Sequence, residues 1–132
     1  MFAIEVETSF CAAHALRLPG GVLEPLHGHN FNVTIRIECA QLDTIETVTD
    51  FHPVEAALAK IIGPWSNRNL NEIEPFRTSV NPTAERIAEQ IGKQMQRALE
   101  ALLPAADTQA RHVHLAEVRL TEAANCLAIW MP

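Results

Sequence analysis

The stretch FNVTIRIEC (residues 31–39) alternates apolar and polar side chains along its whole length. This period of two is typical of a β-strand with one buried face, because successive side chains of a strand point to opposite sides of the sheet. Residues 2–10, FAIEVETSF, follow a similar alternation. A loop around residues 19–21 and Pro25 separates the two segments, so we expect them to form an antiparallel pair.

Two helices are predicted in the middle of the chain. Residues 53–62 place their apolar side chains on one helical face and open on a proline. A longer helix is predicted over residues 82–103, where apolar side chains recur with the helical period. Asn81 is its expected N-cap, with a proline in the first helical position, and Pro104 ends it. The segment 65–81 is expected to be irregular.

Two more strands are predicted over residues 113–120 and 126–131, with a turn at 123–125 between them. The order strand, strand, helix, helix, strand, strand (ββααββ) predicts an α+β fold, with one four-stranded antiparallel sheet and two helices on one face. The other face is then solvated or buried in an oligomer. We expect residues 1–132 to form a single domain.

Composition and charge exclude several classes of function. The net charge of −6 argues against nucleic acid as a partner, because such binding needs dense lysine and arginine to neutralise phosphates. No apolar stretch approaches the length of a membrane span, and residues 1–15 lack the basic start of a signal peptide. Three cysteines without a CxxC motif indicate reduced thiols, so we expect a cytoplasmic protein.

His27 and His29 form an HxH pair at the entrance to the strand 31–39. Side chains two apart on a strand point the same way, so both imidazoles can reach one ion. Their odd numbering matches the apolar face of that strand, and His14 has the parity of the apolar face of the first strand. The three histidines are therefore expected to converge at one end of the buried face, unless a bulge at Gly28 breaks the alternation.

Three neutral imidazoles suit zinc, and a site with three protein ligands leaves the fourth position open for water or substrate, which is the catalytic pattern. The alternative is that these are ordinary histidines near a strand end. A second HxH pair, His112 and His114, has no third histidine close to it in the sequence and is expected to mark a strand entrance. His52 is expected in a loop.

The motifs FCAAHAL (10–16) and LHGHNFNV (26–33) resemble those of the 6-pyruvoyl-tetrahydropterin synthase and 6-carboxytetrahydropterin synthase family. Further matches run along the chain: VTDF (48–51), NRNLN (67–71), NPTAER (81–86) and VRLTE (118–122). The resemblance implies the tunnelling fold, in which subunits join as trimers that pair into homohexamers around a strand barrel. It also implies a small-molecule pterin substrate and a Zn²⁺ cofactor.

The resemblance assigns roles to five residues. His14, His27 and His29 match the zinc ligands of the family. Glu122 matches the glutamate that anchors the pterin ring, and a carboxylate can accept two hydrogen bonds from the N–H edge of a 2-amino-4-oxo ring. Thr83 matches a threonine that helps to hold the pterin. From the residues alone, Glu122 is also compatible with a surface acid at a strand end, and Thr83 with the first turn of a helix.

The usual proton-transfer set of this family is missing. Common members carry a cysteine four residues before the first histidine of the HGH motif, where this chain has Leu23. They also use an Asp-His pair before the Asn-Leu-Asn motif, where this chain has Ser66 and Asn67. None of these three side chains acts as a general base near neutral pH. Cys11 lies at a different motif position and is expected to be a packing residue.

One acid remains beside the predicted site: Glu24, three residues before His27, giving ExxHGH. This resembles a subgroup in which glutamate stands in for the cysteine and the product is 6-hydroxymethyl-7,8-dihydropterin. The favoured function is therefore a zinc-dependent lyase acting on the side chain of 7,8-dihydroneopterin or its triphosphate, with Glu24 as the base of a retro-aldol cleavage. A solvated loop acid is the alternative for Glu24.

Two other functions stay open. The first is a 6-carboxy- or 6-pyruvoyl-tetrahydropterin synthase with a relocated acid/base set, in which His112 or His114 replaces the lost histidine. The second is a zinc- and pterin-binding protein without turnover, which the missing side chains favour. Four basic residues are candidates for binding a triphosphate tail, or are solvated surface charge: Arg17, Arg68, Arg77 and Lys60.

Overall fold

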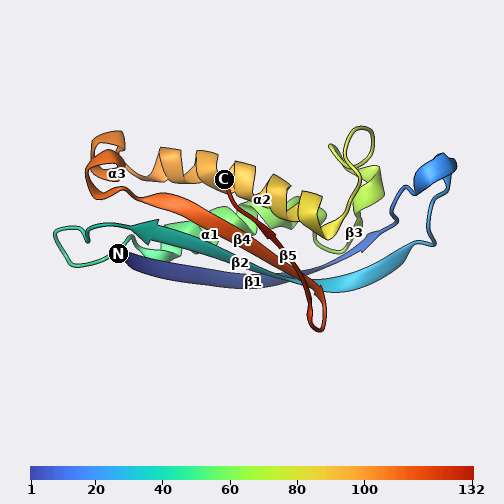
Figure 1. The fold of residues 1–132 in the computed structure, drawn as a ribbon, viewed down its shortest axis with the longest axis horizontal. Helices are drawn as coiled ribbons and strands as arrows, with labels where there is room; N and C mark the ends of the chain where they lie inside the picture. Colours follow the sequence, from blue (N-terminus) through green and yellow to red (C-terminus); the bar gives the residue numbers. More distant parts are fainter.

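Two long strands form the centre of the fold (Figure 1). In the computed structural model, which describes all 132 residues, β1 (Phe2–His14) pairs antiparallel with β2 (His27–Cys39). β4 (His114–Ala123) pairs with the other edge of β2, and β5 (Cys126–Trp130) pairs with β4. A two-residue strand, β3 (Arg68–Asn69), runs parallel to the end of β1. The sheet therefore has five strands in the order β3-β1-β2-β4-β5.

Two long helices cover one face of this sheet (Figure 1). They are α1 (Phe51–Ile62) and α2 (Ala84–Leu102), and a shorter helix, α3 (Ala105–Arg111), follows α2. Three single-turn 3-10 helices occur in the connections: η1 (Pro19–Gly21), η2 (Gly63–Trp65) and η3 (Leu70–Glu72). None of the helices is both long and apolar enough to cross a membrane.

The predicted α+β class and the order of its main elements are confirmed. The sheet has one strand more than the four predicted. The additional strand, β3, was not predicted because its two residues are too few to show an alternation. α3 was also not predicted. It is anchored by the buried guanidinium of Arg111, which donates to the Val48 carbonyl at 3.0 Å and pairs with Asp107. A helix anchored by an ion pair shows no apolar period in its sequence.

α1 begins two residues before the predicted start at Pro53. Asp50 caps the helix, because its carboxylate accepts a hydrogen bond from the His52 N–H at 2.9 Å. The first helical residue is therefore Phe51. His52 lies in the first helical turn and not, as predicted, in a loop.

α2 begins two residues after its predicted start. Thr83 is the N-cap and Ala84 the first helical residue, so the predicted cap at Asn81 and the start at Pro82 are wrong. The side chain of Asn81 binds elsewhere: its Oδ1 accepts from the Arg17 N–H at 2.8 Å, and its Nδ2 donates to the Arg17 carbonyl at 3.1 Å. The Asn81 side chain is thus hydrogen-bonded to a distant part of the backbone, and it is not available to cap the helix that follows it.

The pairing of β1 with β2 runs over all 13 residues of each strand without a register shift. His14 lies opposite His27, and no bulge occurs at Gly28. The even-numbered residues of β1 and the odd-numbered residues of β2 therefore share the buried face up to the end of the ladder, as the alternation predicts.

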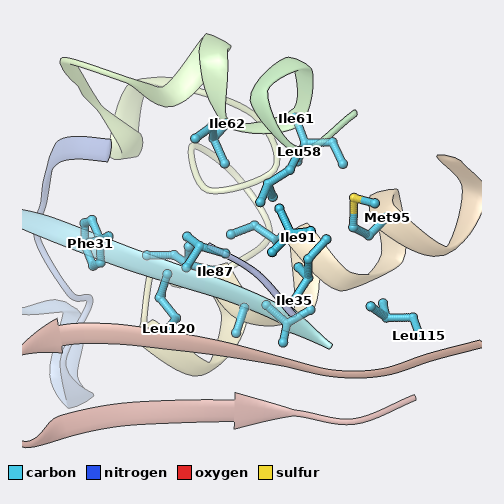
Figure 2. Packing of buried hydrophobic residues seen from close by; sticks show 14 of the residues in the cluster. Phe31, Ile35, Leu58, Ile61, Ile62, Ile87, Ile91, Met95, Leu115 and Leu120 are labelled. Atoms are coloured by element: carbon cyan, nitrogen blue, oxygen red, sulfur yellow. The ribbon is translucent and has the colours of Figure 1, made fainter. Parts of the chain in front are cut away.

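The core fills the space between the sheet and the two long helices (Figure 2). α2 contributes Ile87, Ile91 and Met95, which are fully buried. Figure 2 shows Ile87 and Ile91 on the side of the strand that carries Phe31. Full burial of one such side chain stabilises the fold by about 1.5–3 kcal/mol. The helical stripe is shorter than predicted, because Leu102 at its end is 42% exposed.

α2 also meets β5 through a glycine. A Cβ atom added at Gly92 would lie 2.1 Å from the Cε3 and Cζ3 atoms of Trp130, far inside van der Waals contact. The Trp130 ring therefore lies directly on the helix backbone, where only glycine leaves room for it.

We expect Gly92→Ala to lower the free energy of unfolding by about 1–3 kcal/mol, because overpacking outweighs the better helix propensity of alanine. Urea unfolding followed by circular dichroism measures this change. Gly63→Ala is the matched control, since Gly63 has a helical φ of −51° and nothing lies within 4 Å of an added Cβ. Equal stability of the two variants would contradict the packing of Trp130 on Gly92.

Candidate metal centre

Three histidines meet at the end of the β1–β2 ladder. His14 and His27 form its last pair, and His29 lies two residues further along β2 on the same face. The ring centroids are 4.7 Å apart for His14 and His27, and 4.9 Å apart for His27 and His29. The centroids of His14 and His29 are 5.2 Å apart. The structure thus brings together the three histidines predicted as metal ligands.

A fourth donor comes from β4. Glu122 lies on the face of β4 that also carries the buried Leu120. Its Oε1 atom is 2.9 Å from His14 Nε2 and 3.4 Å from His29 Nε2. One donor atom of each histidine and one of Glu122 all lie within 4.8 Å of one another. Three imidazoles and a carboxylate at this separation can hold a metal ion.

Backbone carbonyls fix two of the imidazole rings. His14 Nδ1 lies 2.7 Å from the Pro82 carbonyl oxygen, and His27 Nδ1 lies 2.8 Å from that of Pro25. A carbonyl oxygen only accepts, so each Nδ1 carries a proton and donates it. The lone pair of each ring is then on Nε2, the nitrogen left free for a metal. This is the arrangement usual for metal-bound histidine.

The Nε2 atom of His14 is buried and makes no hydrogen bond. Glu122 Oε1 is 2.9 Å away, but the geometry of the contact is not that of a hydrogen bond. A buried polar atom left without a partner costs about 1–3 kcal/mol. A metal ion held by the cluster would satisfy this nitrogen, so the residues fit a cation.

The cluster is open to solvent on one side. The His14 side chain is 1% exposed, whereas those of His27 and His29 are 40% and 24% exposed. An ion held here is therefore anchored from the interior through His14 and can be reached by a small molecule past the other two rings.

Glu24 lies at the rim of the cluster. Its Oε1 atom accepts a hydrogen bond from the Leu16 N–H at 2.9 Å and is 3.8 Å from His27 Nε2. The Glu24 N–H in turn donates to the Leu16 carbonyl at 3.0 Å. These two bonds hold the carboxylate beside the histidines. At this position it can take a proton from a molecule bound at the cluster.

The hydroxyl of Thr83 caps a helix. It accepts a hydrogen bond from the Arg86 N–H at 3.2 Å, at the start of α2. The preceding residue, Pro82, supplies the carbonyl that orients His14. Thr83 therefore fixes the helix start from which one of the three imidazoles is held.

Two asparagines hold the chain where it leaves β1. Asn71 accepts from the Ala15 N–H and donates to the Ala15 carbonyl, both at 2.8 Å. Asn81 makes the same pair of bonds with Arg17. Each amide thus pairs with the backbone as a neighbouring strand would. Sequence reasoning missed both, although each lies in a matched motif, because an asparagine in a loop carries no sign of its distant partner.

Arg17 is a structural residue. Its guanidinium donates to the carbonyls of Val80 at 3.0 Å and Arg77 at 3.1 Å, and also to that of Phe76. These bonds organise the loop that leads into α2. Arg17 was a candidate for binding a phosphate, but both terminal nitrogens of its guanidinium donate to the backbone. The Arg77 guanidinium likewise pairs with Glu74.

The second HxH pair lies at the far end of the sheet. His114 opens β4, as predicted for a strand entrance, and pairs with Glu38 in β2. Positions 27 and 38 of β2 are 11 residues apart, which corresponds to roughly 36 Å along a strand. Within one chain, neither His112 nor His114 reaches a molecule bound at the cluster.

His52 is also remote from the cluster. It pairs with Asp50 at 3.0 Å, and the hydrogen bond to this carboxylate raises the pKa of the His52 imidazole. Asp50 lines a cavity together with Phe2, at the end of β1 opposite to His14. Within one chain, this Asp-His pair therefore does not replace the pair missing at Ser66 and Asn67.

Known proteins share this fold. The family profile described as 6-pyruvoyl tetrahydropterin synthase matches residues 3–132. Among solved structures, the 6-pyruvoyl tetrahydropterin synthase of Caenorhabditis elegans is similar with a TM-score of 0.79 and 19% identity, over 99% of this chain and 95% of that chain. Comparison with curated proteins found no significant match.

Two Plasmodium proteins are similar in structure to this chain to nearly the same degree. The 6-pyruvoyltetrahydropterin synthase of Plasmodium vivax, solved as a glutamate-to-alanine mutant of a catalytic residue, has a TM-score of 0.77 and 20% identity, over 99% of this chain and 97% of that chain. The Plasmodium falciparum enzyme has a TM-score of 0.74 and 19% identity, over 98% of each chain. These likenesses confirm the predicted tunnelling fold.

We expect Thr83→Ala to lower the free energy of unfolding by about 1 kcal/mol, because the N-cap hydrogen bond of α2 is lost. Thr83→Ser keeps the hydroxyl and should remain close to the wild type. Chemical unfolding of the three proteins measures the difference. The capping role is wrong if the alanine and serine variants unfold at the same urea concentration.

Proposed function

The chain belongs to the 6-pyruvoyl tetrahydropterin synthase family, and on this premise we propose that it is a zinc-dependent lyase acting on the side chain of 7,8-dihydroneopterin or its triphosphate. The proposed products are 6-hydroxymethyl-7,8-dihydropterin and a two-carbon aldehyde. The observation that carries this proposal is the Glu24 carboxylate beside the three-histidine cluster, 3.8 Å from His27 Nε2.

Zinc is the proposed metal, with His14, His27 and His29 as its ligands. Neutral imidazole is among the ligands that zinc prefers, and backbone carbonyls already orient two of these rings. When bound, zinc supplies a Lewis acid that lowers the pKa of the two side-chain hydroxyls nearest the pterin ring.

Glu24 is the proposed base. Its carboxylate takes the proton of the hydroxyl on the second side-chain carbon, which becomes the aldehyde carbon. The bond between the first and second side-chain carbons breaks, and the dihydropterin ring takes up its electron pair. Glu24 then returns the proton to the first carbon, which stays on the ring as the hydroxymethyl group, and the two-carbon aldehyde leaves. General base catalysis of this kind contributes about 10²–10⁴-fold to the rate.

Two glutamates have carboxylates in ion-pair range of the cluster, Glu24 and Glu122. The Plasmodium vivax synthase has a catalytic glutamate, which supports a glutamate as a catalytic residue on this fold. Glu122 is the proposed anchor of the pterin ring, because its carboxylate can accept two hydrogen bonds from the ring's N–H edge. Thr83 is the proposed second contact to the pterin. Glu24 is then the acid available for proton transfer.

A second candidate is the synthesis of 6-pyruvoyl-tetrahydropterin, which the names of the similar proteins favour. This reaction moves protons at more than one side-chain carbon and so needs further acid/base groups. His112 and His114, the histidines considered for this role, lie at the other end of β2 from the cluster within the same chain. We therefore favour the retro-aldol cleavage.

We also propose that the working form is a cytoplasmic homohexamer built from two trimers. The sheet face opposite the helices supports this, because no other element of the chain covers it (Figure 1). The face carries an ion-pair network in which Glu5 contacts both Arg36 and Arg119 at 3.3 Å. β5 leaves an unpaired strand edge at which another copy can add.

We expect the purified protein to bind about one zinc ion per chain, and His29→Ala to lose it, because a catalytic zinc site needs its three protein ligands. His114→Ala is the control and should keep the zinc, since it lies at the other end of the sheet. Metal analysis by inductively coupled plasma mass spectrometry after gel filtration gives the stoichiometry. Equal zinc contents in the two variants would rule out His29 as a ligand.

We expect Glu24→Gln to reduce the turnover number by about 10²-fold or more, because the amide cannot take a proton. The glutamine keeps an oxygen that can accept from the Leu16 N–H, so the loop should stay in place. The measurement is incubation of the zinc-loaded protein with dihydroneopterin triphosphate, with the product identified by mass spectrometry.

Glu55→Gln is the matched control for this test, because Glu55 is an exposed glutamate on α1, remote from the cluster. Wild-type turnover in Glu24→Gln would show that Glu24 is not the base. A 6-pyruvoyl product from the wild-type protein would overturn the proposed cleavage in favour of the second candidate.

A further inference from the structure

We propose that Glu122 has two partners in turn: it is the fourth ligand of the metal in the free protein, and it leaves the metal when a pterin binds. The first half follows from the geometry of the cluster alone. The second half rests on the proposed function, in which Glu122 anchors the pterin ring. Glu122 then controls when the metal has an open position.

The distances suit a tetrahedral ion. Zinc bonds to nitrogen and oxygen are about 2.0–2.1 Å long, so two donors of a tetrahedral site are about 3.3 Å apart. Glu122 Oε1 lies 2.9 Å from His14 Nε2 and 3.4 Å from His29 Nε2, on either side of this value. The Glu24 carboxylate fits less well: its Oε1 is 3.8 Å from His27 Nε2 and accepts a backbone hydrogen bond.

The protonation of His14 also calls for a cation between it and Glu122. The Pro82 carbonyl holds the proton on Nδ1, so Nε2 presents a lone pair. The carboxylate oxygen 2.9 Å away presents lone pairs as well, and the two atoms form no hydrogen bond. Two acceptors in this position repel one another, whereas a divalent ion between them makes both of them ligands.

Glu122 borders a second space besides the cluster. A cavity of about 270 Å³ lies between the start of α2 and the start of β5, lined by Glu122, Glu85, Asn125, Cys126 and three apolar residues. None of the three clustered histidines lines it. A change of the Glu122 rotamer therefore moves its carboxylate from the metal towards a space that can receive a ligand.

The two roles of Glu122 exclude one another at any one moment. An anchor that accepts two hydrogen bonds from the pterin edge uses both carboxylate oxygens, so its bond to the metal must break. With four protein ligands the metal shell of the free protein is closed, as in a structural site. Pterin binding then opens the position at which the side-chain hydroxyls are bound, and the two events are coupled.

Zinc affinity tests the first half. We expect Glu122→Ala, in the full-length protein, to weaken zinc binding at least about tenfold in competition with a chelating dye, as loss of groups around a bound metal commonly does. Glu122→Gln should also weaken it while preserving the shape of the side chain. Glu85→Ala is the matched control: it removes the other carboxylate of the cavity and should keep wild-type affinity. Equal affinities of Glu122→Ala and Glu85→Ala would overturn the fourth-ligand role.

The absorption spectrum of the cobalt-substituted protein tests the release. Azide alone should leave the wild-type spectrum unchanged, because Glu122 closes the metal shell. Neopterin, a pterin with the same side chain, should change the spectrum by itself, because its hydroxyls take the position that Glu122 leaves. Glu122→Ala should respond to azide without neopterin. A wild-type response to azide alone overturns the closed site, and neopterin that binds without changing the spectrum overturns the release. If neopterin does not bind at all, the proposed function and the release fail, while the zinc affinities still decide whether Glu122 is a ligand.

Discussion

The antiparallel ladder between β1 and β2 holds the other parts of the molecule in place. Its 13 pairs run without a shift from the start of β1 to the last residue, where the histidines lie. A slip of one residue would turn His27 and His29 to the opposite face, away from His14. The same slip would expose Val33 and Ile35, which are fully buried. The apolar core under the helices therefore determines where the three histidines lie, at the end of the ladder where only His14 is buried.

Towards the histidine end the ladder passes into the loop between β1 and β2, which extends beyond the helices (Figure 1). Polar side chains replace apolar packing in this region. The amides of Asn71 and Asn81 pair with backbone groups just beyond β1, and the Arg17 guanidinium binds the carbonyls of the loop before α2. Directional bonds of this kind hold the site in shape and leave it open to solvent. A layer of packed apolar side chains would cover it.

Local pattern was enough to predict the strands, the bodies of the two long helices and the convergence of His14 with His27 and His29. The alternation of side chains records the face on which each of them lies, and that information is contained in the strand itself. The helix caps were misplaced, because Asn81 is taken by a residue 64 positions away and leaves Thr83 as the cap. α3 and β3 were missed for a similar reason: polar contacts to distant residues and very short strand pairings leave no periodic pattern of apolar residues in the sequence.

The surroundings of the three histidines show the same limit of local sequence pattern. The approach of Glu122 to His14 follows from the pairing of β4 with β2, and no spacing within the sequence contains it. A resemblance to known motifs singled out Glu122, and the structure added its neighbours. For Glu24 the sequence predicted only closeness to His27, whereas the bond from the Leu16 N–H shows how the carboxylate is kept there.

The bond from His14 to the Pro82 carbonyl joins residues 68 positions apart, one at the end of β1 and one at the entrance to α2. An ion bound by His14 and by the histidines of β2 would therefore fasten two strands to one another and, through this bond, to the helical layer. All three cysteines of the chain are free thiols. The ion would thus serve as a reversible cross-link, and its loss would loosen the projecting loop while the packed half of the sheet stays intact.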